Sequence, residues 1–482
     1  MAEPADELVP EAATLPSGRV ARTARIGGLA ASQGARWAGM RAANRVRTPE
    51  RAAAAEQART AALINELVDR LAQMRGAAMK VGQMLSLADL DGLPEEQRDE
   101  LQRKLASLRD DVPPVSFASI ERLLRQELGG PLERFFSDFD ERALAAASIG
   151  QVHRATTITG AEVVVKVQYP GVAEAVETDL RNAMLLVPLI RRLAPGLDAR
   201  ALGAELRERI GEELDYELEA QNQRRVERLL RGHPFMRVPG VHSELSSRRV
   251  LVSDYVEGER FEAVRAASQA QRDRYAEIVF RFFFGLLYRD RIALGDPHPG
   301  NYLSCADGHV CFLDFGLLRQ VSRERVGGEA AVARAVREDD QRALKEALVG
   351  AGYLPTERAG AVDASFLLAL MRRATGWYAL PGQRRFAAAD PGNGGQPAPA
   401  AHGHERGGHE RGGAAREQVN QLTLPPEAIL IRRMHGVVAA VLETLRAGAD
   451  WGAIAAEYLH GEPPATELGR LEAAFYAARV GR

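Results

Sequence analysis

The chain has 482 residues, of which 46% are hydrophobic and 27% are charged, and its net charge is −2 at pH 7. These values are ordinary for a globular protein with a large core. They exclude a fibrous or fully disordered chain, and the near-neutral charge does not favour nucleic-acid binding. The two cysteines, Cys305 and Cys311, are too few for a disulfide framework, which predicts buried thiols in a reducing cytoplasm.

Residues 1–60 form an arm rich in Ala and Arg, for which two interpretations stay open. The arm is a solvated helix, or it is a basic amphipathic segment that lies on anionic lipid at the inner face of a membrane. The N-terminus lacks the basic start and apolar core of a secretory signal, and the best apolar run, 183–190, is too short to cross a bilayer. We therefore expect a soluble or peripheral protein.

A helix with one apolar face is predicted next, because apolar residues recur at steps of three and four from Leu63 to Leu85. Lys80 and Gln83 lie one turn apart on this helix, so both side chains can project to the same side. Taken alone, this Lys-Val-Gly-Gln tetrapeptide is also typical of an ordinary polar patch.

A segment of small residues and a strand follow a break at Pro113–Pro114 and a helix predicted over 117–128. The strand over 161–168 is rich in Val and carries one lysine, Lys166. Taken alone, Lys166 is also typical of an ordinary surface lysine. Kinase-like folds cover ATP with a turn of small residues and contact its phosphates with a lysine of the next strand. Alanines keep phosphates farther from the backbone than glycines do. We therefore expect this chain to bind the phosphates of a nucleotide differently from ordinary protein kinases. The candidate nucleotide-binding residues of the turn are Leu144, Ala145, Ala146, Ala147, Ser148, Ile149, Gly150, Gln151 and Val152.

A charged helix is predicted to contain residues 213–222. Asp215 and Glu219 lie one turn apart on it, and a lysine that meets such carboxylates stabilises them, so Glu219 is the predicted partner of Lys166. Without the kinase-like context, an exposed acidic helix face is an equally good interpretation. The strand over 250–256 is then predicted to be the hinge between two lobes, where backbone groups can bind an adenine.

The segment from 293 to 316 contains the most closely spaced candidate catalytic residues. Asp296 is followed five positions later by Asn301, and Asp314 opens an Asp-Phe-Gly triplet after a hairpin predicted to turn at Asp307–Gly308. Protein-kinase-like enzymes use this layout for phosphoryl transfer. Asn301 and Asp314 supply the hard oxygen ligands that Mg²⁺ prefers, and Asp296 can orient or deprotonate the attacking group. A surface turn is the competing interpretation, because Asp, Pro, Gly and Asn all favour turns.

The remaining chain is predicted to be mainly helical, with an apolar core helix over 275–288 and further helices over 430–461 and 467–480. A low-complexity insert at 387–415 contains Pro-Gly-Asn-Gly-Gly and two His-Glu-Arg-Gly-Gly repeats. Such Gly-rich polar sequence cannot bury a core, so we expect this insert to be disordered.

Taken together and in this order, the motifs resemble the UbiB/AarF family of atypical kinases over most of the chain. The resemblance implies an α+β, two-lobed, protein-kinase-like fold that is mostly helical. It also implies an N-terminal helical extension, bearing Lys80 and Gln83, that packs over the nucleotide cleft and blocks peptide substrates. In the family, Glu213 and Asp215 belong to the motif that meets this extension. The implied parts are an arm at 1–60, the extension at 61–112, an N-lobe at 113–258 and a C-lobe at 259–482 that contains the insert 387–415.

The resemblance also implies ATP and Mg²⁺ as cofactors, the catalytic residues Lys166, Asp296, Asn301 and Asp314, and a role in isoprenoid quinone or related lipid biosynthesis. Two hypotheses remain open. The first is an ATPase or small-molecule kinase that acts on or beside isoprenoid lipid intermediates. The second is a nucleotide-switched, pseudokinase-like scaffold or chaperone for a lipid-biosynthetic complex. A conventional protein kinase ranks third, because the extension would block the peptide groove.

Overall fold

The computed structural model describes residues 47–48, 51, 115–147, 149–184, 211–295, 297–386 and 417–480. The chain divides into two compact units. Unit 1 holds the described residues up to Ala220 together with Val241–Tyr255, and unit 2 holds Gln221–Gly240 and the chain from Val256 onward. The predicted extension at 61–112 and insert at 387–415 lie outside the described residues, and the predicted domain boundaries remain predictions.

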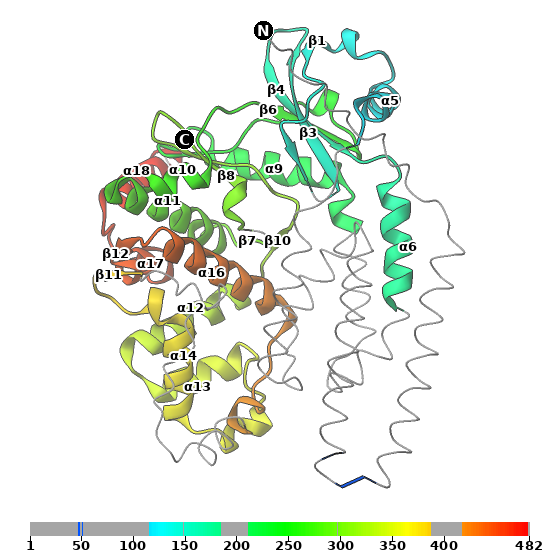
Figure 1. The fold of residues 1–482 in the computed structure, drawn as a ribbon. Helices are drawn as coiled ribbons and strands as arrows, with labels where there is room; N and C mark the ends of the chain where they lie inside the picture. Colours follow the sequence, from blue (N-terminus) through cyan, green and yellow to red (C-terminus); the bar gives the residue numbers. More distant parts are fainter. Residues whose placement is uncertain are drawn as a thin grey trace. The chain divides into compact units, whose positions relative to one another are not determined.

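Unit 1 is built on a five-stranded antiparallel sheet with strand order β1-β3-β4-β6, in which β2 also pairs with β3 (Figure 1). The strand predicted over 161–168 is β4, whose run of valines suits a pleated surface. The unit contains α5 (Phe117–Leu128), η1 (Leu132–Arg134), β1 (Phe136–Phe139), β2 (Ala145–Ala146), β3 (Gly150–Thr157), β4 (Glu162–Gln168), α6 (Val172–Met184), η2 (Ser243–Leu245), β6 (Val250–Asp254) and the start of α9 (Tyr216–Leu230).

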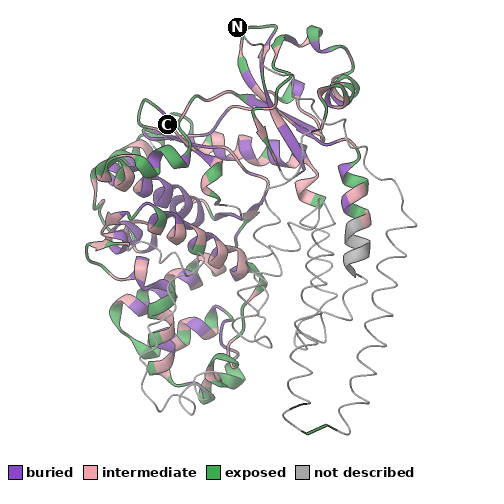
Figure 2. Cartoon of the chain, in the orientation of Figure 1, coloured by how far each residue is buried: buried purple, intermediate pink, exposed green. Residues whose placement is uncertain are grey.

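Helix α5 packs on one face of this sheet. The ring centroid of Phe117 lies 5.7 Å from that of Phe139 in β1 and 5.8 Å from that of His153 in β3. Val163 and Val165 of β4 are fully buried in the same core. Buried positions along the strands of the sheet are purple in Figure 2. The helix ends at Gly129, whose φ of 74° is the left-handed conformation that glycine adopts without strain. The helix predicted over 117–128 is confirmed.

Unit 2 is mainly helical and carries three short sheets, in which β7 pairs with β10, β11 with β12, and β9 with both β5 and β8. Several helices begin at a side-chain cap, for example α12 at Ser322 and α13 at Asp340. Its elements are β5 (Met236–Arg237), α10 (Phe261–Ala266), α11 (Gln269–Tyr288), β7 (Ile292–Leu294), η3 (Pro299–Asn301), β8 (Tyr302–Ser304), β9 (Val310–Phe312), β10 (Leu318–Gln320), α12 (Arg323–Glu338), α13 (Gln341–Gly350), η4 (Thr356–Ala361), α14 (Ala364–Ala379), β11 (Arg384–Arg385), α16 (Pro426–Thr444), β12 (Gly448–Ala449), α17 (Trp451–Leu459) and α18 (Glu467–Val480).

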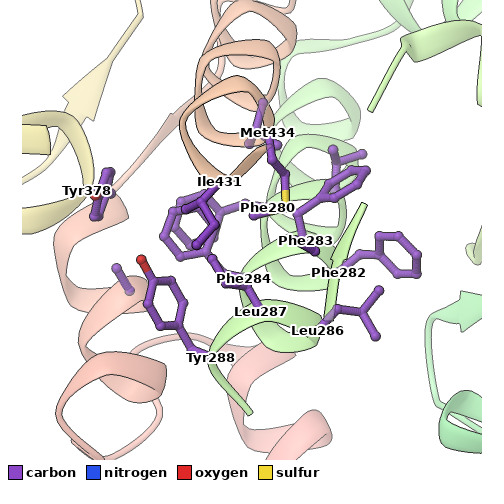
Figure 3. Close-up of a cluster of buried hydrophobic side chains, with 14 of the residues drawn as sticks. Phe280, Phe282, Phe283, Phe284, Leu286, Leu287, Tyr288, Tyr378, Ile431 and Met434 are labelled. Atoms are coloured by element: carbon purple, nitrogen blue, oxygen red, sulfur yellow. The ribbon is translucent and has the colours of Figure 1, made fainter. Parts of the chain in front are cut away.

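Helix α11 forms the centre of the unit 2 core and confirms the helix predicted over 275–288. Figure 3 shows Phe280 and Phe283 beside Ile431 and Met434 of α16. Phe282 points away from them and stacks on Phe312 of β9 with ring centroids 3.5 Å apart. The Phe280 and Phe284 rings stack with centroids 3.9 Å apart. The helix begins six residues before the predicted start, because Ser268 and Gln271 form a capping box that satisfies its first backbone amides.

A buried ion cluster joins α11 to the last two helices. The guanidinium of Arg281 is fully buried and donates to Glu277 at 2.7 Å, to Glu457 at 2.8 Å and to Glu472 at 3.1 Å. Glu472 also accepts from Arg289 at 2.9 Å. Charges removed from water in this way are stable only because each finds partners, so Arg281 fixes α17 and α18 to the core.

The hairpin and the C-terminal helices follow the predictions. Strands β8 and β9 pair antiparallel around a turn that includes Gly308, whose φ is 84°. Cys305 and Cys311 are buried free thiols, as expected, and burial raises the pKa of both. Helices α16, α17 and α18 occupy the tail predicted to be helical, but the predicted stretch 430–461 is interrupted by the short strand β12 between α16 and α17. None of the helices in the described ranges has the length and hydropathy needed to cross a membrane.

Two buried histidines make the stability of unit 2 depend on pH. His435 stacks on Phe284 with ring centroids 5.0 Å apart, and neither ring nitrogen has a hydrogen-bond partner within the described structure. Burial lowers the pKa of His435 to about 3, and burial together with nearby arginines lowers that of His233 to about 3. Each imidazole is therefore held neutral in the folded chain.

We expect stability to fall as the pH is lowered from 7 to 5, because the unfolded histidines bind protons below about pH 6.5 while the folded ones stay neutral until about pH 3. Each buried histidine accounts for about 2 kcal/mol of this loss. Urea unfolding at both pH values measures it. The variant His435→Phe, which keeps an aromatic ring but does not titrate, should lose less stability than the wild type; an equal loss in both would contradict the assignment.

Candidate functional site

One face of the unit 1 sheet is buried, and the other face is partly open. Strand register pairs Val152 with Lys166 and Lys166 with Leu251, so these three side chains form a row on one face. Val152 and Lys166 are half-buried, whereas Val163 and Val165 on the opposite face are fully buried. The sheet therefore presents Lys166 on its partly open face.

Lys166 forms an ion pair with Glu219 of α9, the pairing predicted from the sequence. Its ammonium donates to both carboxylate oxygens, at 2.7 and 2.9 Å. The Lys166 side chain is 22% exposed and that of Glu219 is 5% exposed, so the pair is largely shielded from water. The ammonium also lies 4.9 Å from the centre of the Tyr216 ring. This arrangement fixes the position of one positive charge on the open face of the sheet.

Asp215 differs from its predicted place within a continuous helix. The helical turn at 211–213 ends at Leu214, and α9 begins only at Tyr216. The Asp215 carboxylate accepts the amides of Glu217 and Leu218, both at 3.1 Å, and so caps α9. An aspartate competes for backbone amides in this way and starts a helix more readily than it continues one. The predicted continuous helix over 213–222 is therefore interrupted at Asp215, although the Glu219 amide still donates to the Asp215 carbonyl one turn away, at 3.2 Å.

The turn of small residues is a closed hairpin between β2 and β3. Ala145 and Ala146 pair with β3, and the Ala147 amide donates to the carbonyl of Gly150 at 2.8 Å. Ser148 lies outside the described residues, Leu144 is exposed, and Ile149 is buried.

Gly150 is required at the start of β3 because no side chain fits there. A Cβ at this position would collide with the carbonyl oxygen of Val167 and lie 2.9 Å from the Tyr216 hydroxyl. We expect Gly150→Ala to destabilise the fold by about 1–3 kcal/mol, measured by urea unfolding. Gly211→Ala is the matched control, because a Cβ at residue 211 would meet no atom of the described residues within 4 Å. Equal stability of the two variants would contradict this account.

The side chain of Gln151 lies on the covered face of the sheet. Gln151 and His153 alternate with Val152 along β3, and both are buried. The Gln151 amide nitrogen lies 2.8 Å from His153 Nε2, whose other ring nitrogen lies 2.8 Å from the Asp140 carbonyl. The neutral ring therefore donates from Nδ1 to that carbonyl and accepts from Gln151. Any direct contact of Gln151 with a nucleotide must come from its backbone.

In unit 2, backbone hydrogen bonds tie the Asn301 loop to the Asp-Phe-Gly segment. The amide of Leu313 donates to the Asn301 carbonyl at 3.0 Å, which brings Asn301 next to Asp314. The Asp314 carboxylate accepts the amide of Gly316 at 2.9 Å. The loop before Asn301 is held by His298, whose Nδ1 accepts the amide of Gly300 at 3.1 Å.

A second connection holds the other end of the same loop. The amide of Gly295 donates to the carbonyl of Leu317 at 2.7 Å, which extends the antiparallel pairing of β7 with β10 by one residue. Asp296 lies between Gly295 and Asn301, outside the described residues. The predicted catalytic loop is therefore bound to the Asp-Phe-Gly segment at both of its ends.

The chemistry of Asn301 and Asp314 fits a magnesium ion that a nucleotide brings with it. Within the described ranges, no three His, Cys, Asp or Glu side chains gather into a metal site. Mg²⁺ is commonly held by one or two protein oxygens together with phosphate oxygens and waters. One carboxylate and one amide, both half-buried, suit that coordination.

Asn222 is a residue that the sequence predictions missed. Its side-chain amide donates to the Phe315 carbonyl of the Asp-Phe-Gly segment at 3.0 Å. Asn222 lies three residues after Glu219 on α9, so helical spacing places the two side chains on neighbouring positions of one face. That spacing was visible in the sequence, but nothing indicated that the amide would meet a backbone carbonyl so distant along the chain.

The antiparallel sheet with its lysine–glutamate pair and the helical unit with its Asn and Asp loops define a kinase-like α+β protein. Sequence comparison matches residues 107–348, half of the chain, to the ABC1 atypical kinase-like domain. The chain belongs to this family, which confirms the predicted UbiB/AarF membership.

Several relatives are about 30% identical to this chain over the aligned residues. It is 32% identical to the rat mitochondrial atypical kinase COQ8B over 68% of this chain and 62% of that protein. It is 30% identical to the yeast mitochondrial atypical kinase COQ8, over 60% of this chain and 58% of that protein. The chain thus matches less than two thirds of the length of these relatives. The solved Mycobacterium tuberculosis complex of Rv3197 with erythromycin superposes with a TM-score of 0.58 at 28% identity, covering 85% of this chain and 98% of that one.

Proposed function

We propose that this chain is an ATP- and Mg²⁺-dependent atypical kinase or ATPase that supports isoprenoid quinone or related lipid biosynthesis. The observation that carries the proposal is the Lys166–Glu219 pair, with both oxygens of a nearly buried carboxylate holding one ammonium. A lysine fixed in this way on a partly open sheet face is suited to contact nucleotide phosphates. Family membership supports nucleotide binding independently.

Each remaining predicted site residue has a role in the proposal. Mg²⁺ bound with the nucleotide would neutralise phosphate charge, and Asn301 and Asp314 would hold it. Asp296 would orient the attacking hydroxyl or water, or remove its proton. The turn from Leu144 to Val152 would cover the phosphates, with its backbone closed by the Ala147–Gly150 hydrogen bond.

The proposal extends to the choice of acceptor. Lys80 and Gln83, outside the described residues, would belong to an extension that closes over the site and excludes peptides, and Glu213 and Asp215 would meet it. An occluded site favours water or a small lipid-like acceptor over a protein. The Arg-rich arm would allow peripheral contact with an anionic membrane.

Nucleotide binding is tested by calorimetric titration with ATP and Mg²⁺. We expect Lys166→Met to weaken ATP binding about 10- to 150-fold, which is the contribution of a charged hydrogen bond. Lys345→Met is the control, because the Lys345 ammonium donates to the Val362 carbonyl in the helical part of unit 2. Its ATP affinity should equal that of the wild type.

A second variant separates an effect on ATP binding from an effect on the stability of the fold. Lys166→Met removes both ammonium hydrogen bonds of the nearly buried Glu219 carboxylate, which by itself destabilises the fold. The double variant Lys166→Met/Glu219→Gln removes that charge. A folded double variant that binds ATP as tightly as the wild type would contradict the assignment of Lys166.

The scaffold hypothesis is the second candidate, and the closed alanine turn favours it. Methyl groups at Ala145 and Ala146 limit how closely phosphates approach the backbone. A scaffold would bind ATP without turnover, and an Asp296→Asn gene would then restore quinone levels in a deletion strain. Loss of rescue by this variant would favour the enzyme.

A further inference from the structure

The residue immediately before Asp296 is a buried glycine that is enclosed by two leucines. A Cβ added to Gly295 would lie 2.8 Å from a terminal methyl group, Cδ1, of Leu430 and 3.0 Å from the Cβ of Leu317. Carbon atoms in contact are normally about 3.5–4.0 Å apart, so no side chain fits here unless a neighbour moves. The φ of Gly295 lies outside the left-handed region, so the close approach, and not the backbone conformation, calls for glycine.

Leu430 belongs to a part of α16 that is firmly held in the core of unit 2. The next residue, Ile431, is fully buried. The guanidinium of Arg432 donates to the buried carboxylate of Glu329 on α12 at 3.2 Å. Helix α16 also packs on β7, the strand that leads into Gly295. The helix therefore fixes the position from which the Leu430 side chain reaches the loop.

The other neighbour, Leu317, belongs to the segment that follows the Asp-Phe-Gly triplet. Its carbonyl accepts the amide of Gly295 at 2.7 Å, so these two backbone segments are expected to move together. Leu430 lies far along the chain from both and comes from the helical core. Its methyl group fills the space where a side chain of residue 295 would stand. Because a planar peptide bond joins Gly295 to Asp296, any shift of the glycine moves the start of Asp296 as well.

We propose that Leu430 is a positioning residue for the catalytic loop, which it fixes through its close approach to Gly295. The inference rests on the proposed function, in which Asp296 orients or deprotonates the attacking group. A displacement of about 1 Å in such a group costs about 100-fold in rate. Nucleotide affinity depends on other residues, among them Lys166, and should be affected much less. Leu430 thus links the helix that follows the insert to the catalytic step.

The test exchanges one carbon atom between the two positions in the full chain. Gly295→Ala adds the Cβ that collides with Leu430, and we expect turnover at saturating ATP and Mg²⁺ to fall about 10-fold or more. ATP affinity, measured by calorimetry, should stay within about 3-fold of the wild type. Leu430→Val shortens the opposing side chain by one carbon. The double variant Gly295→Ala/Leu430→Val therefore conserves the total volume and should recover turnover to within about 3-fold of the wild type.

Two matched controls lie on α16 itself. Gly436→Ala makes the same change as Gly295→Ala where a Cβ would meet no atom of the described residues within 4 Å. Ile429→Val also removes one carbon from a half-buried side chain, but residue 429 lies about 100° around the helix from Leu430. Both controls should turn over ATP like the wild type. Thermal melting checks that each variant folds.

Three outcomes would overturn the inference. They are wild-type turnover in Gly295→Ala, a double variant as slow as Gly295→Ala, and an equal loss of turnover and ATP affinity, which would indicate a general disturbance of the fold. A wild type that does not turn over ATP contradicts the enzymatic proposal itself, and this inference with it. If Gly295→Ala does not fold, Leu430→Ala, which removes the methyl group beside Gly295, should lower turnover about 10-fold with ATP affinity retained. Unchanged turnover in that variant would contradict the inference.

Discussion

Asp314→Asn is expected to reduce ATP turnover by about 100-fold or more, the usual loss when one fixed electrostatic contact to a reacting centre is removed. Asp314 opens the Asp-Phe-Gly segment, and its carboxylate is oriented by the Gly316 amide at 2.9 Å. Asparagine keeps the shape and can still accept that hydrogen bond, but it removes the negative charge that Mg²⁺ requires. Turnover is measured as phosphate release at saturating ATP and Mg²⁺.

Asp307→Asn is the matched control for this experiment. Asp307 lies in the turn of the same hairpin, where its carboxylate accepts from Arg237 at 2.7 Å and both side chains are well exposed. The same chemical change at Asp307 should leave turnover unaltered, because exposed ion pairs contribute little. Unchanged turnover in Asp314→Asn, or an equal loss in both variants, would contradict the enzymatic proposal and leave the scaffold hypothesis.

Arg281→Met is expected to lower the free energy of unfolding of unit 2 by about 3–5 kcal/mol, the usual cost of removing one partner from a buried ion cluster. Methionine fills much of the volume of arginine, so the loss comes from charge and not from a cavity. Glu277 and Glu457 would keep their carboxylates in the core without the guanidinium that now binds them at 2.7 and 2.8 Å. Urea unfolding followed by circular dichroism measures the change.

The control is Arg342→Met, which breaks an exposed pair with Glu346 on α13 at 3.0 Å. Its unfolding curve should match that of the wild type, because exposed pairs are screened by water. The destabilisation in Arg281→Met should also shrink at lower pH, where the orphaned carboxylates take up protons. A loss that does not change with pH would contradict the electrostatic explanation.

Several elements could be predicted because their signals are local. The helix over 117–128 was predicted after the break at Pro113–Pro114, and the hairpin after Asn301 from Asp307–Gly308 between two apolar strands. The helical tail was predicted as well, and α16, α17 and α18 confirm it. Such patterns depend on residues within one or two turns of each other, so the sequence contains the whole signal.

Other features could not be predicted, because they depend on which backbone groups meet. The helix is broken before α9 because the Asp215 side chain accepts hydrogen bonds from two backbone amides. The periodicity of apolar residues does not indicate such a bond. The contact of Asn222 with the Phe315 carbonyl and the burial of Gln151 beside His153 depend on the packing of distant segments. No spacing pattern in the sequence predicts either contact.

The sequence by itself determined the family, the kinase-like α+β class, and the order of the lysine, asparagine and aspartate motifs, because residue types at fixed spacing encode chemistry and periodicity directly. Tertiary structure alone decided how far each ion pair is shielded from water and which distant side chains join it. The ion pair of Lys166 with Glu219 at 2.7 Å could be guessed from the motifs, but its shielding from water required the folded sheet and helix. The same holds for Arg281, where only packing brings three glutamates from three helices around one guanidinium. Burial strengthens these interactions and makes their loss costly, and burial is a property of the whole fold, which no short stretch of sequence contains.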